Sequence, residues 1–192
     1  MAFDRPLPPT PTLETQRLRL RPLRLGDAPA IQRLFADWEV VRHLLARVPW
    51  PYPEDGAETN VRESLEKCAR GQLMCWALTF RDGDDGLAGR IDLRPDQGDQ
   101  EMRGFWLAKA HWGQGLMTEA ADAVTAYAFD VLGWPHLYVT NAAANLASHR
   151  IKEKQGFSLI RTVDGEFVDG VRVKEVWLLT ADSWRRMSAN LS

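Results

Sequence analysis

The hydrophobic and polar positions of this chain follow two different periods, and the changes between them outline its elements. Residues 17–22 (RLRLRP) alternate strictly, which predicts a strand with Leu18 and Leu20 facing inward. Residues 102–107 predict another strand, and a turn at 111–115 (HWGQG) follows it. Apolar or small residues then recur at helical spacing and predict a long helix: Leu116, Ala120, Val124, Tyr127, Ala128 and Val131.

The same patterns predict the remaining elements. Asp27 is a suitable N-cap for the first helix, since its carboxylate can accept from unpaired backbone N–H groups. The final strands are expected to pair across a turn at 164–170. We predict helices over 27–38, 54–69 and 145–155, a last helical turn over 182–187, and further strands over 73–80, 87–93, 136–140, 157–163 and 171–180. The resulting order, β-α-α-β-β-β-α-β-α-β-β, is that of a mixed α/β architecture.

Domain organisation is simple, because no repeat or linker divides the chain. Residues 13–192 are predicted to form a single domain, and the proline-rich residues 1–12 a loose arm. The 192 residues are 45% hydrophobic and 26% charged, which is typical of a soluble globular protein. No apolar run approaches the length of a signal peptide core or a membrane span, so we expect a cytoplasmic protein with no membrane partner.

Charge and cysteine content narrow the function classes. The net charge of −2 gives no support for nucleic-acid binding through bulk charge. Cys68 and Cys75 fit no CxxC spacing and have no Cys/His cluster beside them, so we expect two reduced thiols and no metal site.

The Gly113-Gln114-Gly115 turn is the first candidate for chemistry. A glycine turn that enters a helix leaves backbone N–H groups unpaired at the positive end of the helix dipole, where an anion can bind. A dinucleotide-binding fingerprint would need a third glycine where Thr118 stands, and a P-loop would need a Gly-Lys pair, which the chain lacks. The turn therefore either holds a different phosphate or only connects strand and helix.

A second strand–helix unit follows, with the spacing Asn145-x-x-Ser148-x-x-x-Lys152-x-x-x-Gly156-Phe157. With this unit the chain resembles the GNAT superfamily of acyl-CoA-dependent N-acetyltransferases, and within it the branch of the ribosomal-protein N-terminal acetyltransferases. The matching stretches lie within about residues 13–180 and read LETQRLRLRPLRLGDAPAI, GFWLAKAHWGQGLMTEA and NLASHRIKEKQGF. The resemblance implies a mostly antiparallel central sheet flanked by helices, acetyl-CoA as cosubstrate, and an amine acceptor.

The resemblance also implies where acetyl-CoA binds. Its pyrophosphate would lie on the turn and the start of the helix, at Trp112, Gly113, Gln114, Gly115, Leu116, Met117 and Thr118. Trp112 and Met117 depart from the superfamily pattern, but backbone N–H groups do the binding there, so a changed side chain need not abolish it. The pantetheine arm would run along Leu107, whose backbone would hold the acetyl carbonyl where its strand splays from the strand at 136–140. Asn145 would face the pantetheine arm.

The reaction requires a neutral amine, a held oxyanion and a proton for the leaving thiolate. Many superfamily members supply that proton from a Tyr seven residues after the Asn, but here this position is Lys152, so the assignment is lost. We predict that Ser148 takes the role; the alternative is a helix serine bonded to a carbonyl one turn back. Glu166 and Glu101 are the candidate bases, against the alternative that each is a solvated surface carboxylate.

The acceptor is not fixed by these motifs. An α-amine has a pKa of about 7.7–8 against about 10.4 for lysine, so a tenth or more of it is neutral at pH 7. This favours a protein N-terminus, with a mouth framed by residues 42–53 and 164–170 in which Trp50 and Tyr52 are wall or core residues. A small-molecule amine (polyamine, aminoglycoside or amino acid), another acyl group, and a non-catalytic acyl-CoA-binding module stay open. We expect a monomer or weak homodimer.

Overall fold

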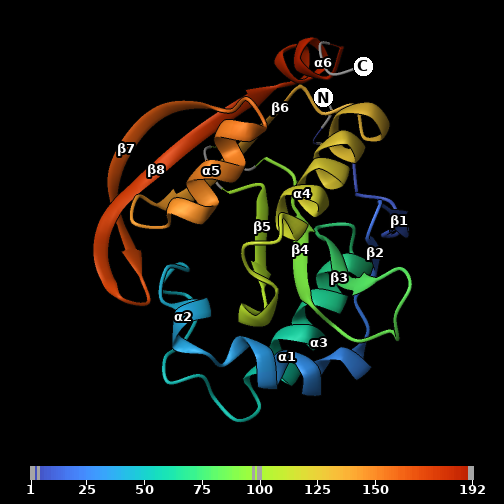
Figure 1. The fold of residues 1–192 in the computed structure, drawn as a ribbon, viewed down its shortest axis with the longest axis vertical. Helices are drawn as coiled ribbons and strands as arrows, with labels where there is room; N and C mark the ends of the chain where they lie inside the picture. Colours follow the sequence, from blue (N-terminus) through green and yellow to red (C-terminus); the bar gives the residue numbers. More distant parts are fainter. Residues whose placement is uncertain (1–2, 4, 97, 99–100, 190–192) are drawn as a thin grey trace.

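The strands form two sheets in the computed structural model, which describes residues 3, 5–96, 98 and 101–189 (Figure 1). Neighbouring strands pair antiparallel throughout both sheets. The first sheet has the order β1 (Leu13–Glu14), β2 (Leu18–Pro22), β3 (Met74–Phe80), β4 (Gly89–Leu93), β5 (Arg103–Leu107). The second has the order β6 (His136–Ala142), β8 (Gly170–Thr180), β7 (Ser158–Phe167). The predicted mixed α/β class with a mostly antiparallel sheet is confirmed.

Helices cover both faces of the first sheet. One face packs against helices that precede β3, namely α1 (Ala28–Phe35), α2 (Trp38–Val41) and α3 (Gly56–Ala69). The other packs against α4 (Leu116–Ala126), which continues as a π-helical turn over Tyr127–Val131. Short 3-10 turns occur at Leu25–Asp27 and Lys109–His111, and α5 (Leu146–Lys154) and α6 (Ala181–Ala189) accompany the second sheet (Figure 1).

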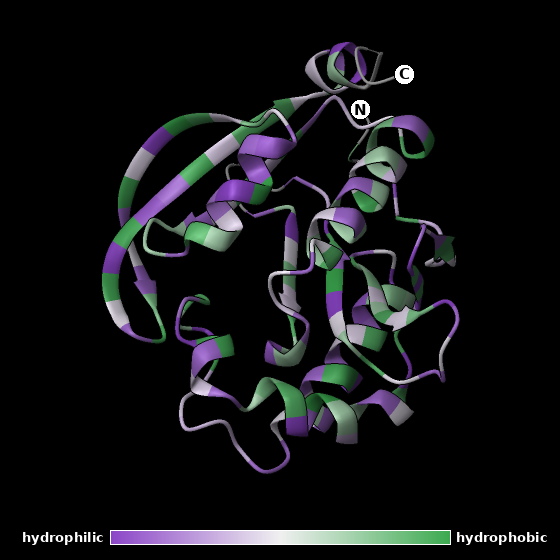
Figure 2. Ribbon diagram, in the orientation of Figure 1, coloured by the Kyte–Doolittle hydropathy of each residue, from purple (hydrophilic) through white to green (hydrophobic). Residues whose placement is uncertain are grey.

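Strand β3 shows why the sheet carries two separate cores. Successive side chains on a strand point to opposite faces. Met74, Trp76 and Leu78 therefore pack with α4, whereas Cys75 and Ala77 pack with α1 and α3. The long β7–β8 hairpin has less cover, and hydrophobic and hydrophilic residues alternate along it (Figure 2).

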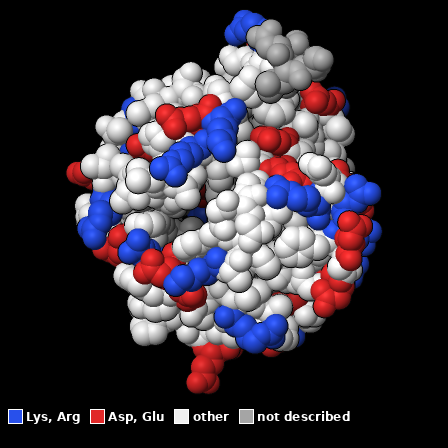
Figure 3. Space-filling model, viewed as in Figure 1, with Lys and Arg blue, Asp and Glu red and all other residues white. Residues whose placement is uncertain are grey.

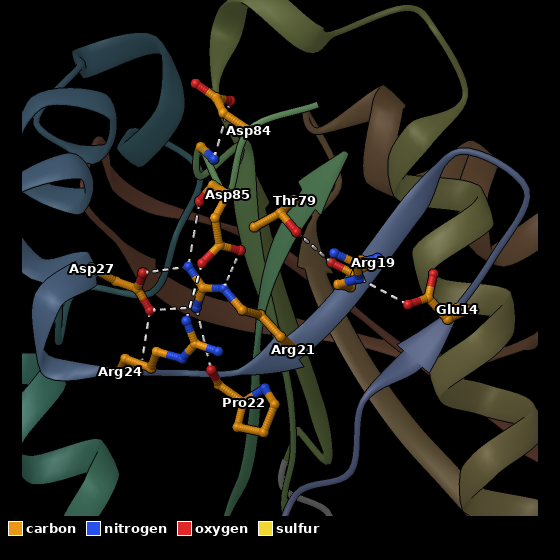
Figure 4. Close-up of polar contacts among 10 residues, drawn as sticks. Glu14, Arg19, Arg21, Pro22, Arg24, Asp27, Thr79, Asp84 and Asp85 are labelled. Atoms are coloured by element: carbon orange, nitrogen blue, oxygen red, sulfur yellow. Dashed lines mark hydrogen bonds and ion pairs between the residues drawn. The ribbon is translucent and has the colours of Figure 1, made fainter. Parts of the chain in front are cut away.

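A buried ion pair ties β2 to the turn before α1 (Figure 4). Arg21, only 4% exposed, donates through Nη1 and Nη2 to the two carboxylate oxygens of Asp27, at 2.9 and 2.7 Å, and through Nε to Asp85 at 2.7 Å. The hydrogen bonds to Asp27 and Asp85 raise the pKa of Arg21 against the effect of burial. Asp27 stands at the N-cap of α1 as predicted, but its side chain makes no capping bond to that helix. It accepts instead from Arg21 and from the Arg24 backbone N–H at 2.8 Å.

The N-terminal segment differs from the loose arm that the prolines predict. Leu7 is buried in the α4-side core, and its N–H donates to the Gly71 carbonyl at 2.8 Å. The Trp76 indole N–H donates to the Pro11 carbonyl at 2.7 Å. Proline removes only its own backbone donor, so residues 7–11 pack through Leu7 and through carbonyl oxygens. Residues 1, 2 and 4 of the predicted arm lie outside the described residues.

The final hairpin is also tighter than predicted. Asp164 to Phe167 continue β7, and their partners run from Val173 to Gly170, so the turn shortens from 164–170 to two residues. The Asp and Gly residues here favour a turn locally, but Phe167 is buried and forms an isolated bridge with Leu45, and this tertiary contact keeps the segment extended.

The surface of the molecule excludes few classes of function by itself. Acidic and basic side chains are interspersed on the face seen in Figure 3. Within the described part of the chain, no helix is long and apolar enough to cross a membrane, and no three His, Cys, Asp or Glu side chains cluster as metal ligands.

We expect Asp27→Asn to lower the free energy of unfolding by about 3 kcal/mol, because it leaves the Arg21 guanidinium buried beside a neutral group. Urea unfolding would measure the loss. The matched control is Asp85→Asn, which removes a half-exposed partner of the same arginine and should cost about 1 kcal/mol or less. Equal losses from the two variants would contradict this account of the cluster.

Candidate active site

The glycine turn before α4 is built to present backbone N–H groups. Gly113 and Gly115 have φ angles of 74° and 75°, in the left-handed region that glycine adopts without strain. Both are exposed, and Gly115 is the N-cap of α4. Glu119 N–H bonds to the Gly115 carbonyl at 3.1 Å, so the N–H groups of residues 116–118 precede the first helical hydrogen bond and have no partner within the helix.

Side chains around the turn hold it rather than extend from it. The Trp112 indole N–H donates to the Leu107 carbonyl at 2.8 Å, which ties the turn to the end of β5. Arg17 Nη1 donates to the Gln114 carbonyl at 2.8 Å, and its Nε pairs with Glu119 at 2.7 Å. Leu116 and Met117 are buried in the core, so only their backbone N–H groups can serve a ligand. Glu119 neutralises the guanidinium of Arg17, so this pair holds the turn and adds no net charge beside it.

Strands β5 and β6 separate next to this turn. The two sheets meet where Met102 N–H donates to the Tyr138 carbonyl at 2.8 Å, and β5 and β6 then belong to different sheets. The bond from Ala108 N–H to Ala88 sets the alternation of β5, so that the N–H groups of Phe105 and Leu107 face away from β4 and into the gap. The two strands separate as predicted, and the backbone N–H of Leu107 is a free hydrogen-bond donor that faces the gap.

A cleft of about 1090 Å³ opens on the α1/α3 face and reaches this gap. Its walls include Phe105 and Trp106 of β5, Asn141 of β6, and Asn145, Ser148 and Lys152 at α5. The loop at 43–49 and Phe167 line it as well, and hydrogen bonds from Ala46 N–H to Glu166 O (3.0 Å) and from Val168 N–H to Leu44 O (2.9 Å) join loop and hairpin. Tyr52 lines the cleft, whereas Trp50 is exposed and packs on Trp38.

Asn145 and Ser148 lie together at the start of α5. Asn145 caps the helix as its side-chain oxygen accepts from the Ser148 N–H at 3.1 Å. The Ser148 hydroxyl is buried and accepts from Lys152 Nζ at 2.7 Å, which differs from the alternative of a serine bonded only to its own helix backbone. Both residues line the cleft where the two sheets part.

Lys152 is a buried residue of the cleft wall that the sequence pattern did not identify as a candidate site residue. Only 1% of it is exposed, and its ammonium has Ser148 as a hydrogen-bond partner and lies 6.0 Å from the centre of the Phe105 ring. Burial, and then the positive charge of Arg103, lower the pKa of Lys152 to about 7. The buried positions of α5 and its C-cap are polar, at Ser148, Lys152 and Gln155, so no apolar pattern marks this face and spacing does not distinguish a buried lysine from a solvated one.

The two candidate bases occupy different environments. Glu101 lines the cleft with a side chain 16% exposed, and its pKa is raised by burial despite nearby Arg94 and Arg47. Its carboxylate pairs with Arg47 at 3.3 Å, while Arg94 bonds mainly to Asp92. Glu166 is exposed on β7 and does not line the cleft. The structure therefore brings Glu101, Ser148 and Asn145 to one cleft and leaves Glu166 outside it.

A polar network lies behind the cleft wall, and the sequence patterns did not predict it. Glu175 accepts from Asn141 Nδ2 at 2.8 Å and from the Trp177 indole at 3.2 Å, and it lies 3.0 Å from His149 Nδ1. Burial alone would raise the pKa of Glu175, but these hydrogen bonds lower it. The network anchors β6, β8 and α5 to one another, so it fixes the wall that carries Ser148 and Lys152.

The chain is similar to known proteins in sequence and in fold. Residues 17–158 match the family model of the acetyltransferase (GNAT) domain. The chain is 28% identical over 171 residues to the probable N-acetyltransferase YjcK of Bacillus subtilis (strain 168), covering 86% of this chain and 91% of that protein. It is 28% identical over 192 residues to the FsC-acetyl coenzyme A-N(2)-transacetylase of Aspergillus fumigatus, covering 92% and 79%. The solved structure of RimL, a ribosomal L7/L12 alpha-N-protein acetyltransferase in complex with coenzyme A, superposes with a TM-score of 0.74 at 17% identity, covering 90% and 99%.

The burial of Lys152 predicts a pH dependence of stability. Its pKa is about 7 in the folded chain and about 10.4 unfolded, so the unfolded state binds more protons between these values. The free energy of unfolding should therefore rise with pH from 7 towards 10, relative to Lys152→Met. Denaturant unfolding of both proteins at pH 6.5, 7.5 and 8.5 would measure this. Cys75, whose pKa burial raises to about 12, is common to both and cancels. A difference that is constant with pH would contradict the burial of a titrating amine.

Proposed function

The chain belongs to the GNAT family of acetyltransferases, and from that premise we propose that it transfers the acetyl group of acetyl-CoA to a protein N-terminal α-amine. N-acetyltransferase activity follows from the family, which uses acetyl-CoA. The acceptor is the proposed part. One observation supports it: the cleft of about 1090 Å³ extends from the gap to the loop at 43–49 and to Phe167, which leaves an approach for the end of a polypeptide beside the acetyl group.

The names of two similar proteins indicate two different classes of acceptor. RimL is named as an alpha-N-protein acetyltransferase, and the Aspergillus enzyme as an N(2)-transacetylase of FsC. A small-molecule amine or another acyl group is therefore the alternative within the enzyme class. Acyl-CoA binding without turnover is the alternative outside it.

In this proposal, acetyl-CoA binds along the turn and the gap between the sheets. Backbone N–H groups from Gly113 to Thr118 hold the pyrophosphate, and Arg17 fixes the turn through the Gln114 carbonyl. Trp112 and Gln114 act by fixing the turn, and Leu116 and Met117 by seating α4 in the core. The pantetheine arm occupies the gap between β5 and β6, facing Asn145, and the Leu107 N–H donates to the acetyl oxygen.

Chemistry takes place where the gap meets the cleft. The free amine attacks the thioester carbonyl, and Glu101, the carboxylate that lines the cleft, accepts the proton that the nitrogen loses. A raised pKa makes Glu101 a better proton acceptor than an ordinary carboxylate. Ser148 donates its hydroxyl proton to the departing sulfur. Glu166, exposed on the outer strand, is the secondary candidate for the base.

The direct test is thiol release from acetyl-CoA with a panel of N-terminal peptides, polyamines, aminoglycosides and amino acids. We expect the highest kcat/KM with peptides. The highest rate with a small amine would replace the acceptor, and no turnover by folded protein that binds CoA calorimetrically would contradict catalysis.

Gly113→Ala tests the pyrophosphate site. A Cβ at this left-handed position meets no atom within 4 Å, so the change acts through backbone strain of about 1–2 kcal/mol. We expect the turn to shift and the Kd for CoA to rise roughly 5- to 30-fold by calorimetry. Gly133→Ala is the matched control, with φ 66° and equally open space beyond the other end of α4. It should lose similar stability and bind CoA as before; equal weakening by both variants would argue against the site.

Ser148→Ala tests the donor. Loss of a general acid should lower kcat by roughly 100-fold or more, while KM for acetyl-CoA changes little, since the cap at Asn145 bonds the Ser148 backbone rather than its hydroxyl. Steady-state kinetics with the preferred peptide measures both. An unchanged kcat across pH would remove Ser148 from the mechanism.

A further inference from the structure

The pair formed by Lys152 and Ser148 is unusual for a helix interior. An ammonium that is 99% removed from solvent ordinarily has a carboxylate partner. Among the described residues, the hydrogen bonds of Lys152 go only to the Ser148 hydroxyl, at 2.7 Å, and weakly to the Ser148 carbonyl, at 3.4 Å. A buried cation whose main partner is a hydroxyl at a cleft wall calls for an explanation beyond packing.

Ser148 alone cannot complete the proton transfer assigned to it. A thiol has a pKa of about 8.5, whereas a hydroxyl such as that of water has a pKa of about 15.7. Moving a proton from serine to thiolate would therefore replace a weak base by a far stronger one, at high cost. The step becomes favourable only if the serine oxygen receives another proton as it gives up its own. Lys152 Nζ is within hydrogen-bond distance of that oxygen.

Resting on the proposed function, we infer that the Lys152 ammonium is the proton source for the leaving thiolate, acting through the Ser148 hydroxyl. As the C–S bond breaks, its electron pair passes to sulfur, which takes the Ser148 Oγ proton. Ser148 Oγ takes a proton from Lys152 Nζ in the same step and remains a neutral hydroxyl. The acceptor nitrogen loses one proton to Glu101, which later releases it to solvent, and neutral Lys152 regains one proton from solvent. Amine and acetyl-CoA therefore give amide and CoA thiol with protons balanced.

The charges around Lys152 suit this role. Arg103 of β5 presents a like charge, while Glu101, just before β5, and Glu175 of β8 present carboxylates. His149, next to Ser148 on α5, faces Glu175 rather than Lys152. The effects of burial and of Arg103 outweigh those of the two carboxylates, so Lys152 is a stronger acid than the thiol and proton transfer towards sulfur is downhill. The Lys152 side chain is still half protonated near neutral pH.

The test is the dependence of kcat on pH at saturating acetyl-CoA and peptide, in wild type, Lys152→Met and Lys152→Arg. Wild type should lose activity above pH 7 as Lys152 deprotonates. Lys152→Met should be roughly 10- to 100-fold slower at pH 7 and lack this limb. Lys152→Arg keeps the charge but does not release a proton, so it should be as slow as Lys152→Met. Activity restored by arginine, or a limb that persists in Lys152→Met, would overturn the inference.

A matched control variant and an NMR titration make the interpretation of these rates unambiguous. Lys154→Met, two residues on and exposed, is the matched control and should keep the wild-type rate and profile. NMR of lysine-labelled protein, with only five lysines in the chain, should show one side chain titrating near pH 7 that is missing from Lys152→Met. A Lys152 signal titrating above pH 9.5 would overturn the inference even if the variants fail to fold. Wild type without turnover on any amine would instead refute the proposed function.

Discussion

The separation of β5 from β6 is the constraint on which the candidate active site depends. The hydrogen bond between Met102 and Tyr138 marks the point where the sheets part. Beyond it, the odd-numbered residues of β5 present N–H groups that no neighbouring strand takes up. Such groups are costly to leave unpaired in a protein interior. A ligand with carbonyl and amide groups can satisfy them, which is why the proposed function places the extended, peptide-like arm of the cofactor in this gap.

The turn and the two helices on either side of the gap are positioned by polar side chains, not by the core alone. Trp112 joins the turn to β5, and Arg17 joins it to the start of β2. On the other side, Glu175 ties α5 to β6 and β8. The contacts of Arg17 and of Glu175 link segments far apart in sequence, so the spacing between the glycine turn and Ser148 depends on the whole fold.

Sequence reasoning predicted the order of elements because this order rests on local patterns. Strict alternation placed β2, and helical spacing after a glycine turn placed α4. It failed where a tertiary partner decides the outcome. Asp27 has the side chain of a helix cap, but Arg21 binds it; Lys152 was set aside as a departure from a motif, yet burial changes its acidity. In the sequence, Glu101 and Glu166 were both candidates for the base, and only the fold shows that Glu101 is the one that lines the cleft.

The loop at residues 42–48 is attached along the β7–β8 hairpin by backbone hydrogen bonds at Ala46, Val168 and Asp169. This wall of the cleft is consequently ordered during folding. In the proposed function, an acceptor that enters does not bear the conformational entropy of organising this wall, which commonly weakens binding to loop-built sites. On that proposal, recognition depends on fit to a preorganised surface, and changes that loosen the hairpin would weaken acceptor binding without touching any residue that contacts the amine.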